Sequence, residues 1–179
     1  ERALGATAGS RPTVDFPALG VELKTLPIDR WGKPLESTWV CAAPIDGTLA
    51  DRWEDSRVRD KLRCVLWVPV LSERSLPLAQ RRLALPLLWE MDIETEQTLA
   101  SDWRELTDLI RLGRFDEIHA RRGTWLQLRP KAADSRVTRW ALDDESNWVP
   151  VNPKGFYLRA RFTERLLKRH WALPARGSS

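Results

Sequence analysis

Residues 13–25 read TVDFPALGVELKT, and this stretch predicts a β-strand with two chemically different faces. Successive side chains of a strand point to opposite sides, so the alternation in VELK puts Glu22 and Lys24 together on one face. A short loop or strand before it can bring Asp15 alongside. The stretch therefore predicts that two carboxylates and one lysine meet at one place in the fold.

The pattern of Asp15, Glu22 and Lys24 suits a metal-dependent nuclease. Mg²⁺ prefers one or two carboxylates together with waters and substrate oxygens, and it lowers the pKa of a bound water. Lys24 can then reach the attacking water or the scissile phosphate as a point charge. The same short pattern also fits a solvated strand face with a Glu–Lys pair, so these residues alone leave both interpretations open.

The sequence offers little support for other catalytic designs. His119 and His170 are the two histidines, and neither stands in a metal-ligand spacing, which disfavours a histidine–metal nuclease. GxSxG, Walker and GxGxxG motifs do not occur, so serine-hydrolase, ATPase and dinucleotide-binding interpretations have no basis.

The composition predicts one ordinary globular domain. The chain has 179 residues, of which 42% are hydrophobic and 30% are charged. It contains no apolar run near the roughly 20 residues that span a bilayer, and we expect neither a signal peptide nor a membrane partner. Because the chain begins at Glu1 without a methionine, we expect that an N-terminal portion precedes it.

Basic residues gather toward the C-terminus. From Lys154 onward there are seven basic residues and a single acid, Glu164. Such a segment can attract a polyanion such as nucleic acid, although a solvated helix face would read the same way.

The two cysteines, Cys41 and Cys64, each lie inside an apolar, strand-like run without CxxC spacing. We expect both to be reduced thiols in a protein of the cytoplasm.

Periodicity predicts a mixed order of strands and helices, and hence an α/β (α+β) domain with a mixed sheet. We expect the strands 19–26 and 35–43 to form a hairpin, and further strands at 64–70, 85–89, 125–128 and 156–161. We expect helices at 49–62 and 93–112, and a final helix that Thr163 caps and that runs through His170. Residues 133–150 lack clear periodicity and are predicted to form a variable excursion.

Several ordered blocks resemble one family over nearly the whole chain. They read GATAGSRPTVDFPALGVELKTLPID, PLESTWVCAAP, VRDKLRCVLWVPV, ERSLPLAQRR, PLLWE, LRPKAA and PKGFYLRARFTERLLKRH. The chain resembles the MutH family of DNA mismatch-repair endonucleases. The resemblance implies a restriction-endonuclease-like mixed β-sheet flanked by helices, with two arms around a DNA cleft, and a single nuclease domain over residues 1–179 that lacks an N-terminal helical portion.

The resemblance also implies the chemistry of the domain. Family members use Mg²⁺ to nick the unmethylated strand at hemimethylated GATC sites. Asp15, Glu22 and Lys24 match the metal and catalytic residues, Glu1 matches an upstream glutamate near the metal, and Lys61 matches a lysine near the catalytic centre.

Four further residues match family positions that face DNA: Trp39, Arg129, Lys131 and Tyr157. The resemblance implies that Tyr157 takes part in sensing adenine methylation. Pro130 cannot extend a strand ladder, so a loop that presents Arg129 and Lys131 is expected, with arginine suited to a guanine edge and lysine to a phosphate. For Trp39, packing in the core remains an alternative.

The chain departs from the family pattern in three places: the upstream part, the larger aromatic at Trp39, and residues 133–150. As partners the resemblance implies double-stranded DNA, the ATPase MutL and, through it, the mismatch sensor MutS, with the chain itself a monomer. Two rival functions stay open, a restriction endonuclease that cuts both strands of a related site and a DNA-binding fragment without turnover.

Overall fold

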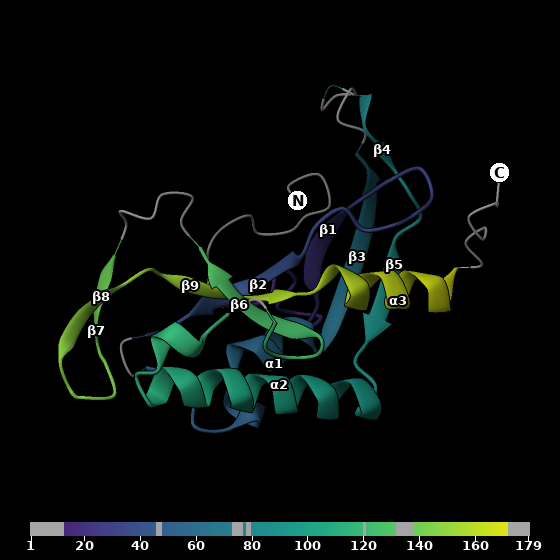
Figure 1. Cartoon of the computed structure of the whole chain (residues 1–179). Coiled ribbons are helices and arrows are strands. Elements are labelled where there is room, and N and C mark those ends of the chain that lie inside the picture. The colour runs from purple at the N-terminus through teal and green to yellow at the C-terminus, as the bar shows by residue number, and fades with distance from the viewer. Residues whose placement is uncertain are drawn as a thin grey trace. The chain divides into compact units, whose positions relative to one another are not determined.

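The computed structural model describes residues 13–45, 48–72, 77, 80–119, 121–131 and 138–171 (Figure 1). The chain divides into two compact units. The first unit comprises residues 1–38, 61–90 and 159–179, and the second comprises residues 39–60 and 91–158.

The elements of the first unit are β1 (Glu22–Ile28), β3 (Cys64–Leu71), β4 (Arg82–Leu83), β5 (Leu87–Glu90) and α3 (Ala160–His170). Those of the second unit are β2 (Thr38–Ala43, of which Thr38 belongs to the first unit), η2 (Trp53–Asp55), α2 (Ile93–Arg111), η4 (Phe115–Glu117), β6 (Leu126–Pro130), β7 (Arg139–Leu142), β8 (Trp148–Val151) and β9 (Lys154–Leu158). Helix α1 (Arg57–Leu62) runs across the boundary between them along the chain.

The sheet of the first unit is mixed, as the sequence predicts. β1 pairs with β3 in parallel, while β4 and β5 pair with β3 in antiparallel orientation. The apolar run of β3 explains its central place, because a strand covered on both faces needs apolar side chains on both. On one face Leu23 and Val68 form a small core with Phe16 and Leu66.

The predicted hairpin of residues 19–26 and 35–43 is wrong. β1 continues to Ile28 and pairs with β3, whereas β2 belongs to a separate sheet with β9 and β6. Pairing after the turn stops at an isolated bridge between Ile28 and Pro34, followed by one hydrogen bond from Leu35 N to Pro27 O. Prolines at both sides of the turn lack the N–H that a longer ladder needs, so the chain leaves for another sheet.

Two helix boundaries also differ from the prediction. The helix expected at 49–62 is a short 3-10 turn, η2, followed by α1, because Ser56 between them has an extended backbone with ψ of 141°. The last helix begins at Ala160 after Arg159, so Thr163 is not its N-cap. Thr163 lies within the first turns and its hydroxyl donates to the carbonyl of Ala160 at 3.0 Å.

The second unit contains a three-stranded sheet in the order β2-β9-β6, which packs against α2 through β6. Helix α2 is the predicted amphipathic helix, and its apolar face, including Leu99, Trp103 and Leu106, is buried. Asp92 caps its N-terminus by accepting a hydrogen bond from Thr95 N at 2.8 Å. The chain turns after it at Gly113, which has a φ of +66°.

The described part of the expected excursion, residues 138–150, contains regular structure that its sequence did not predict. β7 and β8 form an antiparallel hairpin in which Trp140 pairs with Pro150 and Leu142 with Trp148 (Figure 1). Both tryptophans point to solvent, Trp140 with 65% and Trp148 with 66% of its surface exposed. Strands with apolar residues on their exposed side do not show the alternation by which strands are usually found.

Cys41 and Cys64 are free thiols, as predicted. Burial of the Cys64 thiol raises its pKa, which disfavours the thiolate form. Among the helices of the described residues, none combines the length and the apolar character needed to cross a membrane.

Candidate active site and nucleic-acid interface

β1 places Glu22 and Lys24 on one face of the mixed sheet, as their spacing predicts. Neither is solvated: Glu22 is 5% exposed and Lys24 is 7% exposed. The Lys24 ammonium donates to Glu22 Oε1 at 3.2 Å. Because both side chains are buried, the alternative of an ordinary solvated strand face is wrong. Burial of such a charged pair costs desolvation energy.

A tight turn brings Asp15 to the same strand. Phe16 and Val21 form an isolated antiparallel bridge, and Gly20 within the turn has a φ of +67°, a conformation that glycine adopts readily. The Asp15 carboxylate accepts a hydrogen bond from the backbone N–H of Leu23 at 3.0 Å. Leu23 lies between Glu22 and Lys24, so the turn holds Asp15 beside the two charged residues of β1.

Lys61, on α1, completes the charged cluster in the first unit. Its ammonium donates to Glu22 Oε2 at 2.8 Å and to the carbonyl oxygen of Thr13 at 2.6 Å. Lys61 is 8% exposed. Each oxygen of the Glu22 carboxylate therefore contacts a different lysine, and Lys61 also ties the segment before Asp15 to the site.

The cluster of Asp15, Glu22, Lys24 and Lys61 holds two carboxylates and two ammonium groups with no net charge. Buried groups of this kind are common at functional sites, where charge is held in place despite its desolvation cost. Glu1, the fifth residue of the predicted centre, lies outside the described residues. Within the described residues no three His, Cys, Asp or Glu side chains come together as a metal-binding group.

The four residues predicted to face DNA are brought together in the second unit. The rings of Trp39 and Tyr157 meet edge to face, with centroids 5.1 Å apart and planes at 77°. The guanidinium of Arg129 lies 5.6 Å from the Tyr157 ring centroid, and the ammonium of Lys131 lies 5.3 Å from that of Trp39. Each aromatic ring thus carries one cation, an arrangement that quadrupole attraction stabilises.

The expected loop around Pro130 is only partly correct. Arg129 and Pro130 are the last residues of β6, opposite Gly155 and Lys154 of β9, and Lys131 follows directly. Pro130 can end the strand because the next donor, Lys131 N, bonds instead to the carbonyl of Pro153 at 2.8 Å. Arg129 therefore projects from a sheet, which fixes its position more firmly than a loop would.

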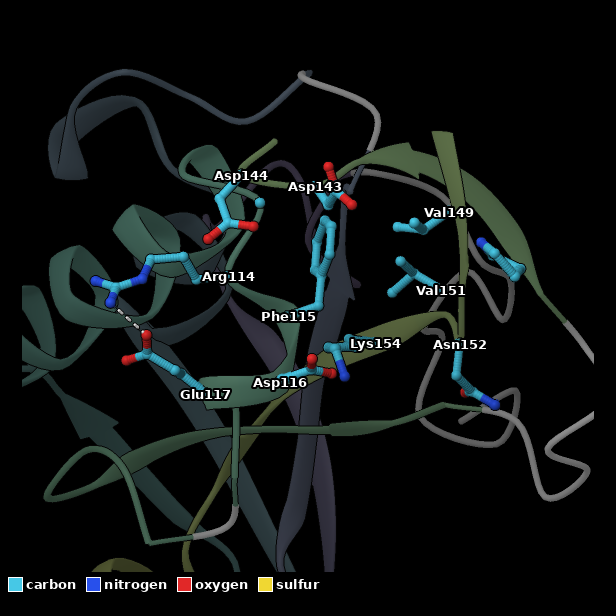
Figure 2. Close-up of a pocket in the computed structure, with 12 residues that line it drawn as sticks. Arg114, Phe115, Asp116, Glu117, Asp143, Asp144, Val149, Val151, Asn152 and Lys154 are labelled. Carbon is cyan, nitrogen blue, oxygen red and sulfur yellow. Dashed lines mark ion pairs between the residues drawn. The ribbon is translucent and has the colours of Figure 1, made fainter. Parts of the chain in front are cut away.

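A cavity of about 580 Å³ lies elsewhere in the second unit and contains none of the predicted site residues (Figure 2). Glu117 in its wall pairs with Arg114 at 2.6 Å and with Arg122 at 3.1 Å, and Asp143 accepts from the backbone of its own turn. Burial lowers the pKa of Lys154 at this cavity, with Asp116 acting in the opposite direction. The cavity offers no arrangement of groups that matches the predicted chemistry.

Two contributions to these sites were not predicted from the sequence. The Thr13 carbonyl is a backbone acceptor for Lys61, and no side-chain pattern reveals such a partner. Gly155 packs against the Trp39 ring. A glycine inside a strand pattern is a recognised signal of close approach, so Gly155 could have been found from the sequence.

Comparison with known proteins gives a family match for this chain. The sequence model of the family described as "DNA mismatch repair enzyme MutH" matches residues 4–102. The DNA mismatch repair protein MutH of Serratia proteamaculans (strain 568) is 53% identical over 171 residues, which cover 96% of this chain and 75% of that protein. MutH of Pectobacterium atrosepticum is also 53% identical, covering 96% of this chain and 74% of that protein.

A third relative, MutH of Escherichia coli (strain K12 / DH10B), is 51% identical over 170 residues, 95% of this chain and 74% of its own length. These matches define the class of the protein as a DNA mismatch-repair enzyme. The chain belongs to the MutH family.

Proposed function

We propose that this chain is an endonuclease that nicks the unmethylated strand at hemimethylated GATC sites in methyl-directed mismatch repair. Membership of the MutH family supports the reaction. The single observation that carries the site is the buried Glu22 carboxylate, which contacts Lys24 at 3.2 Å and Lys61 at 2.8 Å. The next residue of the same strand, Leu23, donates its backbone N–H to the Asp15 carboxylate.

We propose Mg²⁺ as the cofactor, held by Asp15 and Glu22 with the help of Glu1. One carboxylate on β1 and one in the turn that binds β1 suit a hard cation that keeps several waters and takes substrate oxygens. When bound, Mg²⁺ supplies charge for the phosphoryl oxygens and a water of lowered pKa. Before the cation binds, the two lysines paired with Glu22 would balance the charge of its carboxylate. Once the cation and the phosphate are bound, the cation would pair with Glu22 and the lysines with the phosphate.

Lys24 and Lys61 have different proposed roles. Lys24 comes from the same strand as Glu22 and donates to it, and we propose that its ammonium orients the attacking water or binds the scissile phosphate as a point charge. Lys61 comes from α1 and also binds the Thr13 carbonyl, so it positions Glu22 and the turn that carries Asp15. In this proposal both lysines supply positive charge near the phosphoryl oxygens, where negative charge develops in the transition state.

DNA recognition is proposed for Arg129, Lys131, Trp39 and Tyr157. Their aromatic rings and cations form one cluster in the second unit, the chemistry that reads base edges and binds phosphates. For Tyr157 we propose contact with the adenine whose methylation is sensed.

We propose that residues 1–179 act as one nuclease domain of the restriction-endonuclease-like type, with arms around a DNA cleft. The mixed sheet that carries Glu22 and Lys24 supports that class. We further propose a monomer that works in the cytoplasm, in keeping with its free thiols, and that MutL activates after MutS has recruited it.

A nicking assay on a plasmid with a hemimethylated GATC site tests the proposal. The wild type should give nicked circles in Mg²⁺, more with MutL present, and none in EDTA. Lys24→Ala should lower nicking by about 100-fold or more while still binding DNA. Lys33→Ala, which removes an exposed lysine from a turn of the same unit, is the matched control and should nick normally.

The rival functions give other products. Linear plasmid from unmethylated DNA without MutL would indicate a restriction endonuclease. Equal binding by wild type and Lys24→Ala, with no cleavage by either in Mg²⁺, would leave a DNA-binding fragment and overturn the enzyme proposal for this chain.

A further inference from the structure

Gly155 occupies the middle of the sheet face that carries the cluster of aromatic and basic side chains in the second unit. In the ladder of β6 and β9, Gly155 pairs with Arg129, and Tyr157 pairs with Gln127. Residues two apart on a strand share a face, so Gly155, Tyr157 and Arg129 project from the same side. Trp39 comes from β2, the neighbour of β9 on its other side.

The indole of Trp39 fills the space where a side chain at residue 155 would begin. A methyl group on Gly155 would lie 2.6 Å from Trp39 Cη2 and nearer still to Cζ3, closer than real Cβ atoms come to other heavy atoms. The φ of Gly155 is outside the left-handed region, so the backbone does not require glycine there. Glycine is needed because the ring lies across the strand.

The position of the Trp39 ring affects the positions of the other side chains in the cluster, Tyr157, Arg129 and Lys131. The rings of Trp39 and Tyr157 meet edge to face with centroids 5.1 Å apart, and the Lys131 ammonium lies 5.3 Å from the centroid of the Trp39 ring. Tyr157 in turn lies under the Arg129 guanidinium at 5.6 Å. A displaced Trp39 indole would therefore shift Tyr157 and Lys131, which contact it. Arg129 would then lose its contact with the Tyr157 ring.

We propose that Gly155 is a positioning residue for DNA recognition: it seats Trp39, and through Trp39 it sets the places of Tyr157 and Lys131. This inference rests on the proposed function, because it assigns the cluster a reading role. Gly155 itself touches no DNA in this proposal. A displacement of about 1 Å in groups that orient a substrate can lower the rate by about 100-fold. A methyl group at residue 155 should therefore weaken DNA recognition.

The proposal predicts a compensating pair of substitutions. Gly155→Ala forces the indole off its seat. Trp39→Phe shortens the ring and removes the Cζ3 and Cη2 atoms that the new methyl would meet. The double variant Trp39→Phe/Gly155→Ala should therefore resemble Trp39→Phe alone, whereas independent effects would add.

The first readout is structural and needs no activity. Tyr157 is the only tyrosine of the chain, so tyrosine-selective isotope labelling gives a single set of ring resonances. An aromatic ring edge to face shifts these resonances through its ring current. Gly155→Ala in the full chain should move them relative to the wild type, and the double variant should match Trp39→Phe. Trp148→Phe, at an exposed tryptophan of the β7–β8 hairpin, is the control and should leave them unchanged.

The second readout is recognition. With hemimethylated GATC duplex, Gly155→Ala should lower kcat/KM by about 10-fold or more, mainly through KM, and the preference for hemimethylated over fully methylated DNA should fall. The double variant should recover at least about threefold relative to Gly155→Ala. Metal-free binding to GATC and scrambled duplexes gives the same comparison without turnover.

The outcomes separate this inference from the proposed function. Unchanged Tyr157 resonances in Gly155→Ala, or a double variant as defective as Gly155→Ala, would overturn the positioning role even if the wild type nicks GATC DNA. A wild type that binds GATC duplex with preference but does not nick would contradict the proposed function and leave the positioning role standing. A wild type without any preference for GATC duplex would overturn the reading role of the cluster.

Discussion

Lys61 of α1 holds one oxygen of the Glu22 carboxylate on β1 at 2.8 Å, although the two residues are 39 positions apart in the chain. Lys24 holds the other oxygen at 3.2 Å. One buried glutamate is thus shared by a lysine that its own strand supplies and a lysine that a helix supplies. This sharing makes the stability of the first unit depend on residues that we also assign to the chemistry.

Glu22→Gln should lower both stability and nicking. The substitution leaves Lys24 and Lys61 buried without their common counter-charge, and removal of one partner from a buried ion pair costs about 3 kcal/mol or more. Urea unfolding would measure the loss of stability, and the plasmid assay the loss of nicking. Glu36→Gln, at an exposed glutamate of the same unit, should do neither. Equal stability of Glu22→Gln and wild type would mean that the two ammonium groups find other partners.

Lys61→Met should loosen the turn before β1, and Lys24→Met should not. Both variants remove a contact to Glu22, but Lys61 also binds the Thr13 carbonyl. Hydrogen exchange of a peptide covering residues 13–20 should therefore become faster in Lys61→Met by about 10-fold or more, the equivalent of one hydrogen bond to a charged group. Similar exchange in the two variants would show that Thr13 is held by other contacts.

Asp102 should contribute strongly to the stability of the second unit. This carboxylate is 4% exposed and accepts hydrogen bonds from the backbone N–H groups of Thr124, Trp125 and Leu126 at 2.6, 2.6 and 2.8 Å. It thereby fixes the start of β6, the strand that carries Arg129. Asp102→Ala removes the acceptor of three backbone donors and should cost about 3 kcal/mol or more, while Asp102→Asn keeps one acceptor oxygen and should cost less.

Asp108→Asn is the matched control for Asp102 because Asp108 lies on the same helix and is mostly exposed, in a pair with Arg111. It should change the free energy of unfolding by less than about 1 kcal/mol. An Asp102→Ala variant with the stability of the wild type would indicate that water replaces the carboxylate at these donors.

Glu96 should make part of the stability depend on pH in the acid range. Hydrogen bonds from Arg59 at 2.7 Å and Trp53 at 3.1 Å lower the pKa of Glu96 in the folded protein. A lowered folded pKa means that this stabilisation is present above the ordinary glutamate pKa of about 4.3 and is lost as the pH falls through the folded value. Glu96→Gln should therefore be less stable than wild type at pH 7 by about 1 kcal/mol, a difference that disappears toward pH 2. A difference that stays constant with pH would contradict this origin.

Local patterns were enough to predict several features correctly. The alternation of VELK predicts that Glu22 and Lys24 share a face, and the apolar periodicity of α2 predicts a helix that ends at Gly113. These predictions hold because side-chain direction in a strand or helix follows from backbone geometry alone. The ordered family blocks extend the prediction to Lys61 and to the four residues of the aromatic and basic cluster.

Other features escaped local patterns because they depend on competition between distant partners. The sequence of residues 19–43 predicts a hairpin, but β1 pairs with the apolar strand β3, and β2 pairs with β9 in another sheet. The hairpin of β7 and β8 exposes apolar residues, so its strands carry no alternation. Thr163 reads as a cap, yet the helix begins at Ala160.

The chain by itself determined which chemical groups exist: Asp15, Glu22 and Lys24 lie within ten residues, and the two-residue spacing of Glu22 and Lys24 on one strand puts them on the same face. Only the tertiary structure decided that Glu22 is buried, that Lys61 reaches it, and that Trp39 lies across Gly155. The physical reason is that burial and long-range contact depend on which surfaces pack together, and packing is a property of the whole fold.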